Sequence, residues 1–300
     1  MLDLTTVNAT AADERQVFDR APAELLVIGG IASVQTGAAF ATKLFVHLGP
    51  AGTVLLRIAF AAIILVAIWR PAVRSYSRYQ LQLATLFGLS LGFMNLSFYE
   101  ALDHIHLGIA VTIEFVGPLA VALAGMRRRL DLVWALFAAT GVVLLGGVSG
   151  ANAEGVLFAL LAGVLWAAYI LINARVGRSF TGGGGLALAM AIGTIPLIPI
   201  GLADAGSALF TPKYLAIGLG VALLSSVIPY SLELEALRRL RPGVFGVLMS
   251  IEPAMAALAG FVVLGQDLSA LDVVAIALVV VASAGAALGA RASAPPPVDA

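Results

Sequence analysis

The chain has 300 residues, of which 61% are hydrophobic, with 17 basic and 17 acidic side chains. Its mean hydropathy is +1.02. A soluble domain carries roughly 25% charged residues, so this composition excludes a water-soluble enzyme and indicates a protein embedded in lipid. The sequence has no cysteine, which excludes thiol catalysis and cysteine-ligated metals, and it has no sustained basic tract of the kind that binds nucleic acid.

A polar segment, residues 1–22, precedes the first apolar stretch and lacks the basic start and cleavage site of a signal peptide. Beyond it, apolar stretches recur at about 20 residues, the length at which a helix crosses about 30 Å of hydrocarbon. We predict ten membrane-spanning helices. Their expected limits are 23–46, 50–69, 79–102, 106–126, 131–148, 155–174, 185–203, 213–237, 243–264 and 271–290. Residues 291–300 form a second polar tail.

The predicted fold is an all-helical integral membrane protein, because a backbone exposed to lipid must satisfy its own hydrogen bonds. Basic residues near span ends favour the cytoplasmic side. Of the 17 basic residues, 14 lie in the tails and in the even-numbered loops, while Lys213 lies on the other side and Lys43 and Arg57 lie within spans. This asymmetry predicts that both termini face the cytoplasm.

The sequence contains an internal repeat. A shift of 135 residues places Glu100–Gly125 over Glu235–Gly260, with nine of 26 positions identical, including the pairs Pro118/Pro253 and Gly125/Gly260. We predict two five-helix halves, 23–148 and 155–290. Because each half has an odd number of helices, the second half enters the membrane from the other side. Inverted halves of this kind are typical of secondary transporters, which bind substrate near the midplane and work by alternating access.

Two glutamates fall near the middle of predicted spans, where a charge costs about 2.5 to 3.5 kcal/mol. Glu114 precedes Pro118 by four residues, and Glu252 is followed directly by Pro253, so each is expected beside a kink. One interpretation is that one or both carboxyls bind a substrate ammonium group or exchange a proton. The other is that each is a protonated carboxyl, hydrogen-bonded between helices.

Three further charges within spans have competing interpretations. Arg57 can pair with a buried glutamate, hold a substrate carboxylate or extend to the interface. Lys43 lies close to a helix end, which favours extension to the interface. Glu233 is one turn deeper than Glu235, and pairing with the arginines that follow is the simpler interpretation. His104 and His106 lie in a short turn, where a solvated loop is a better interpretation than a metal site.

Uncharged polar and aromatic side chains complete the candidate site. The substrate-binding candidates among them are Gln35, Asn95, Trp166, Tyr169, Ser226 and Tyr230. A pocket of amide, hydroxyl, aromatic and carboxylate groups suits a small zwitterion better than an apolar drug or a polyanion. No cofactor or metal is expected. A membrane scaffold or a lipid-handling enzyme remains the alternative from another functional class.

Three stretches resemble one known family. They are FYEALDHIHLGIAVTIEFVGPLAVAL (98–123), WAAYIL (166–171) and PYSLELEALRRLRPGVFGVLMSIEPAMAAL (229–258). They are similar to the EamA-type branch of the drug/metabolite transporter superfamily and, within it, to the bacterial threonine/homoserine exporters.

The resemblance implies ten helices in two inverted five-helix halves, in a bacterial inner-membrane protein that exports small neutral amino acids, driven by proton exchange. We expect a monomer or homodimer. The alternative is a broader metabolite or drug exporter of the same superfamily. Substrate or coupling roles are implied for Gln35, Lys43, Arg57, Asn95, Glu114, Trp166, Tyr169, Tyr230, Glu233, Ser250 and Glu252.

Overall fold

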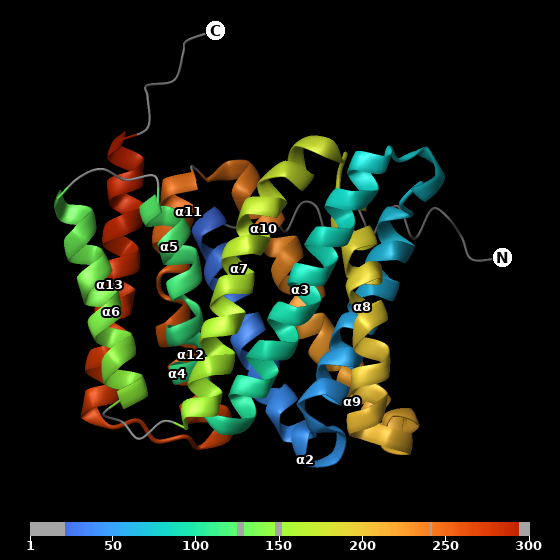
Figure 1. The fold of residues 1–300 in the computed structure, drawn as a ribbon, viewed down its shortest axis with the longest axis horizontal. Coiled ribbons are helices and arrows are strands. Elements are labelled where there is room, and N and C mark those ends of the chain that lie inside the picture. Colours follow the sequence, from blue (N-terminus) through green and yellow to red (C-terminus); the bar gives the residue numbers. More distant parts are fainter. Residues whose placement is uncertain (1–21, 125–128, 148–151, 241, 294–300) are drawn as a thin grey trace, which may run out of the picture.

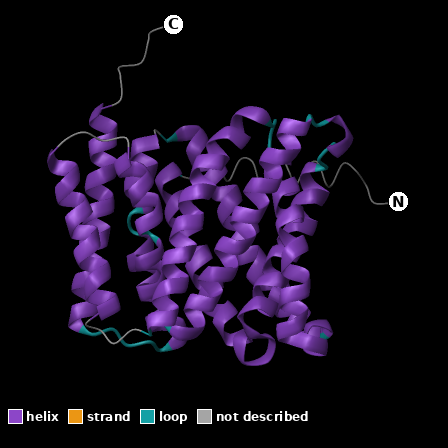
Figure 2. Ribbon diagram, viewed as in Figure 1, coloured by secondary structure: helices purple, strands orange, loops and turns teal. Residues whose placement is uncertain are grey.

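The computed structural model describes residues 22–124, 129–147, 152–240 and 242–293. The tails expected at 1–22 and 291–300 therefore fall almost entirely outside the described residues. Within the described ranges the chain is built of helices and short connections, with no strand (Figures 1 and 2). This confirms the prediction of an all-helical fold.

The helices follow one another with few residues between them. In chain order they are α2 (Ala23–Trp69), α3 (Arg78–His104), α4 (Leu107–Glu114), α5 (Val116–Ala124), α6 (Arg129–Gly147), α7 (Ala153–Ser179), α8 (Gly184–Ala205), α9 (Pro212–Ala222), α10 (Ile228–Arg239), α11 (Pro242–Met249), α12 (Glu252–Leu264) and α13 (Ala270–Ser293). Short 3₁₀ turns, η1 (Val73–Ser75) and η2 (Gly206–Phe210), lie in two of the connections. A π-helical turn, η3 (Leu223–Val227), joins α9 to α10.

Helix α2 consists of two arms that meet at a sharp kink. Gly49 has φ 64° and ψ 171°, a conformation that favours glycine, and Pro50 follows it. The Asp204 carboxylate accepts hydrogen bonds from the amides of Ala51 (2.9 Å) and Gly52 (3.4 Å), at the start of the second arm. The kink lies at one end of the bundle (Figure 1). The predicted spans 23–46 and 50–69 are these two arms.

Three of the helical passages are interrupted part-way. A break at Phe115 separates α4 from α5, and a break at Ser250 and Ile251 separates α11 from α12. The π-helical turn η3 ends just before Pro229. A proline cannot donate the i to i−4 hydrogen bond, so each interruption leaves backbone carbonyls without their helical partners. The kinks predicted beside the two glutamates are therefore present.

Long apolar helices make the chain a multi-pass membrane protein. In the described part of the chain, seven helices are long and apolar enough to cross a membrane, with α2 counted once, and two shorter apolar helices cover Leu107–Val121 and Leu132–Leu145. Large apolar side chains are exposed along their outer faces. On α7, Leu157, Val164 and Leu171 form an exposed stripe at helical spacing. Such a surface is suited to lipid.

Small residues let the helices approach closely where no hydrophobic effect drives association. A Cβ atom at Gly117 of α5 would lie 1.9 Å from the carbonyl oxygen of Gly163 of α7. At Gly88 of α3 it would lie 2.3 Å from the carbonyl oxygen of Ala189 of α8. These contacts leave no room for a side chain, and they fix the helices that surround the interior cavity.

Candidate functional site

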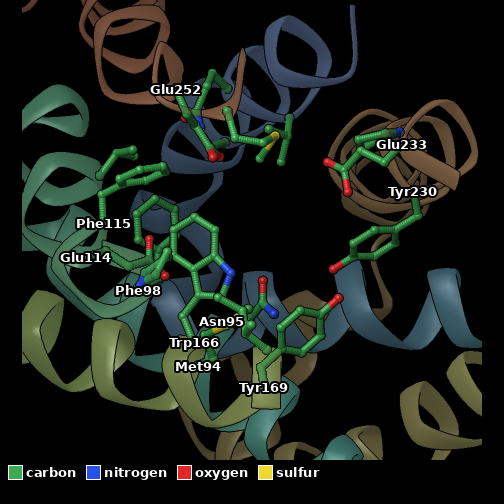
Figure 3. Close-up of a pocket in the computed structure, with 18 of the residues that line it drawn as sticks. Met94, Asn95, Phe98, Glu114, Phe115, Trp166, Tyr169, Tyr230, Glu233 and Glu252 are labelled. Carbon is green, nitrogen blue, oxygen red and sulfur yellow. The ribbon is translucent and has the colours of Figure 1, made fainter. Parts of the chain in front are cut away.

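A cavity of about 450 Å³ lies inside the bundle, within the size range of small-molecule sites. It is lined from α2, α3, α4, α5, α7, η3, α10, α11, α12 and α13, so segments from both predicted halves contribute (Figure 3). Most of the residues predicted from sequence line it. These are Gln35, Arg57, Asn95, Glu114, Trp166, Tyr169, Tyr230, Glu233 and Glu252.

Glu252 is the first residue of α12 and is paired with Gln35. The Gln35 amide nitrogen donates to Glu252 Oε1 over 3.0 Å, and both side chains are buried, at 3% and 7% exposure. The carbonyl oxygen of the Gln35 side chain and Glu252 Oε2 are buried without a partner among the described residues. Since both are acceptors, they are suited to a cationic N–H donor.

Glu114 is the last residue of α4, and its carboxyl lies beside the break at Phe115. The side chain is 6% exposed, and within the described ranges no hydrogen bond to its carboxyl is found. Glu252 and Arg57 line the same cavity. Glu114 therefore lies at the C-terminal end of α4, where the helix dipole disfavours a negative charge. Glu252 lies at the N-terminal end of α12, where the dipole favours one.

Arg57 is the buried cation of the site. It lies on the second arm of α2 with 5% exposure and donates three hydrogen bonds, to Ser226 Oγ (3.2 Å), Tyr99 Oη (3.3 Å) and the Ser225 carbonyl (2.9 Å). The guanidinium carbon is also 5.4 Å from the centre of the Tyr99 ring. Extension to the interface, one of the interpretations above, is therefore wrong for this side chain.

Aromatic side chains form one wall of the cavity. Trp166 packs edge-on against Phe115, with ring centres 5.5 Å apart, and so lies over the α4 break. Tyr169 stacks on Phe87 with ring centres 4.9 Å apart. In Figure 3 the hydroxyls of Tyr169 and Tyr230 point toward one another across the cavity. These rings supply an apolar surface with polar groups at its edge.

Two polar side chains present unsatisfied groups to the same space. Asn95 donates from its amide nitrogen to the Leu91 carbonyl, one turn back, over 2.8 Å. Its amide faces the cavity in Figure 3, as does the half-buried carboxylate of Glu233. Of the arginines expected to pair with Glu233, Arg239 donates from its Nε to Glu235 over 2.8 Å, while the side chain of Arg238 lies outside the described residues.

Three candidates lie outside the cavity lining. Ser250 is fully buried in the α11/α12 break, where its hydroxyl donates to the Gly246 carbonyl over 3.0 Å. Lys43 is exposed and its ammonium nitrogen lies 5.3 Å from the centre of the Phe40 ring, on the same face of α2. Ser226 is fully buried and accepts the Arg57 hydrogen bond without lining the cavity. Ser226 therefore positions the arginine, and a role for Lys43 in coupling stays a prediction.

The sequence analysis missed several lining residues. They are chiefly Met94, Phe98, Phe115, Ser225, Met249 and Ser283. Apolar side chains within apolar spans give no signal that separates a cavity wall from a lipid-facing surface. For Ser225 the reason is geometric: the π turn η3 adds a residue to the helical repeat, which changes the face on which neighbouring side chains lie.

Of the histidines expected in a solvated turn, His104 is the last residue of α3 and His106 directly precedes α4. His104 Nε2 is 3.9 Å from Glu154 Oε1, and the His104 ring stacks with Phe158. Among the described residues, no group of three histidine, aspartate or glutamate side chains is placed to hold a metal ion.

Comparison with known proteins gives consistent matches. The EamA-like transporter family matches residues 153–288. The threonine/homoserine exporters RhtA of Escherichia coli (strain K12) and Salmonella typhimurium (strain LT2) are each 40% identical to the chain over 271 residues, which cover 89% of this chain and 92% of the relative. A protein of solved crystal structure superposes with a TM-score of 0.62 at 19% identity, over 90% of this chain and 98% of its own, which shows a shared fold.

Proposed function

The chain belongs to the EamA-like transporter family, and we propose that it exports threonine, homoserine and similar small neutral amino acids from the cytoplasm. Two relatives that match nearly the whole chain at 40% identity carry this activity in their names. The observation that carries the proposal is the cavity, which presents a buried arginine and buried carboxyls within one space. An amino acid carries both complementary charges.

We propose that the chain crosses the membrane ten times as two inverted halves. The arms of α2 count as two crossings, and the pairs α4/α5, α9/α10 and α11/α12 count as one each. The breaks support the repeat, because α4 covers residues 107–114 and α11 covers 242–249, which is the same length at the offset of 135 seen in the sequence. With this topology both termini face the cytoplasm of a bacterial inner-membrane protein.

Alternating access between the halves is the proposed mechanism. The packing supports a structure that is closed at the outer end, because a Cβ at Gly108 would lie 2.8 Å from the Cα of Ala257, where α4 meets α12. At the other end the cavity lining extends to Asn173, which is exposed, and to Glu233. Substrate would therefore enter this state from the cytoplasmic side.

Proton exchange would drive export through the buried carboxyls. Glu252 and Glu114 have the position needed, because both line the cavity and each lies beside a helix break. Binding of a substrate ammonium group and binding of a proton at the same carboxyl exclude one another, which couples the two movements. Glu233, nearer the cytoplasmic side, would pass protons to the same cavity.

Counterflow of labelled threonine in liposomes tests the proposed function. Purified protein in vesicles loaded with unlabelled threonine should accumulate the label, and a pH gradient should change the rate of net movement. Vesicles without protein are the control. Failure to move threonine or homoserine, with movement of another metabolite or a dye, would support the broader exporter; no movement of any compound would contradict a transport function.

A further inference from the structure

We propose that Arg57 is the carboxylate anchor of the substrate, so that a free carboxylate is a requirement for recognition and not only a tolerated group. This inference rests on the proposed amino-acid export and concerns the same cavity. Arg57 would then distinguish amino acids from the amines and amides that have the same side chains but lack the free carboxylate.

Arg57 carries a buried charge that has no ion-pair partner among the described residues. A guanidinium group remains charged in proteins and has five N–H donors. Arg57 uses three of them, all on neutral acceptors: two hydroxyl groups and one backbone carbonyl. Throughout the described residues, no carboxylate lies within ion-pair distance of it. A buried charge without a counter-charge is costly, and a bound carboxylate would supply the missing partner.

The fixed orientation of Arg57 favours this role. Its partners come from two elements: Tyr99 on α3, and the Ser225 carbonyl and Ser226 hydroxyl in the π turn. The Ser225 carbonyl is available because the residue four positions further on is Pro229, which has no N–H to donate to it. A guanidinium held in this way keeps its two remaining N–H groups in a defined position, which is the arrangement that recognises a planar carboxylate.

A second, opposite pole lies in the same cavity. Glu252 Oε2 and the side-chain carbonyl oxygen of Gln35 are buried acceptors that have no partner in the part of the chain that the structure describes. They match the N–H donors of an ammonium group, as Arg57 matches a carboxylate. The arrangement therefore has one place for each charge of a zwitterion. It predicts that removing the substrate carboxylate leaves the ammonium contacts intact while the guanidinium stays unpaired and repels the remaining positive charge.

Competition against threonine counterflow tests the proposal. Unlabelled threonine, threonine amide and threonine methyl ester are compared as competitors in wild type, Arg57→Gln and Arg57→Lys. In wild type the amide and the ester should compete about 10- to 100-fold more weakly than threonine, the effect expected for hydrogen bonds to a charged group. In Arg57→Gln threonine should weaken by a similar factor while the amide does not, so the preference for the carboxylate disappears.

The other variants keep every outcome informative. Arg57→Lys retains the charge without the planar fork and should have an intermediate preference. It decides the question if Arg57→Gln does not reach the membrane. Arg178→Gln, which changes an exposed arginine near the end of α7, is the matched control and should behave as wild type. A ratio of threonine to amide that is unchanged in the Arg57 variants would overturn the proposal, while wild type that moves no amino acid would contradict the proposed function instead.

Discussion

Glu252 is the residue on which the proposed chemistry depends most directly. It is buried and lies at the start of α12, and among the described residues only one of its two carboxylate oxygens has a partner, the amide of Gln35. The helix start complements a negative charge there. A substrate ammonium group or a proton can thus exchange at the free oxygen while Gln35 holds the other in place.

Glu252→Gln should abolish most of the export while the protein still inserts. The amide keeps the size and a hydrogen bond to Gln35 but carries no charge and releases no proton. We expect threonine counterflow to fall by about 10-fold or more, the equivalent of a lost charge-assisted hydrogen bond. Asp103→Asn, at an exposed position, is the control. Wild-type counterflow together with wild-type response to a pH gradient in Glu252→Gln would contradict both roles.

At the residue scale, the sequence predicted which charged residues line the cavity better than it predicted the contacts that they make. Glu114, Glu252 and Arg57 stand out because a charge in an apolar span requires a reason. Their partners could not be predicted, since contacts such as that between Gln35 and Glu252 join positions 217 residues apart. A charge within a predicted span does not always line the cavity: Lys43 is such a charge, yet it lies outside the cavity.

At the scale of the elements, the interrupted helices are held by contacts between small residues. The α4/α5 break packs against α7 through Gly117 and Gly163, and the carbonyl of Glu114 lies 2.7 Å from the position of a Cβ at Gly163. The backbone of the break is thereby fixed beside the cavity. Side chains at either glycine would separate the two helices and move Glu114.

Gly117→Ala should therefore destabilise the protein, although alanine favours helices. Its Cβ would lie 1.9 Å from the Gly163 carbonyl oxygen, so the helices must shift, and overpacking of this kind costs about 1–3 kcal/mol. We expect a lower thermal unfolding midpoint and reduced counterflow. Gly220→Ala in α9 is the matched control, because its Cβ would meet nothing within 4 Å. Equal midpoints for the two variants would contradict this account of the packing.

Helices and their interruptions were predictable from different signals. Apolar length predicted the helices, and Pro118 and Pro253 predicted the two breaks, because proline removes a hydrogen bond wherever it occurs. The π turn η3 was not predictable, since no residue type specifies it, and the contacts of Arg57 with the Ser225 carbonyl and the Ser226 hydroxyl arise only in the folded bundle.

At the scale of the whole molecule, the topology can be tested with single cysteines, because the chain has none of its own. Ser75 in η1 and Ser207 in η2 are both exposed, and η1 and η2 lie at opposite ends of the bundle (Figure 1). In intact cells a membrane-impermeant maleimide should label Ser207→Cys and not Ser75→Cys. After the cells are opened, both should react. Labelling of Ser75→Cys in intact cells would reverse the proposed orientation.

The whole fold was predictable in outline and the cavity was not. Hydropathy predicted a multi-pass helical protein, while the orientation that follows from the distribution of arginines stays a prediction. The size and lining of the cavity depend on how α7, α10 and α13 pack around α2, which involves contacts between distant segments. A local sequence pattern does not predict which distant segments of the chain come into contact.

The matched lengths of α4 and α11 have a consequence for the outward-facing state. If the two halves arose from one ancestral unit, each has the same pair of shapes available to it, and at any moment they hold different ones. The outward-facing molecule would then be this molecule with the shapes exchanged: the break at Phe115 would adopt the form now found at Ser250, and the reverse. In each cycle of export, the two halves would exchange their conformations.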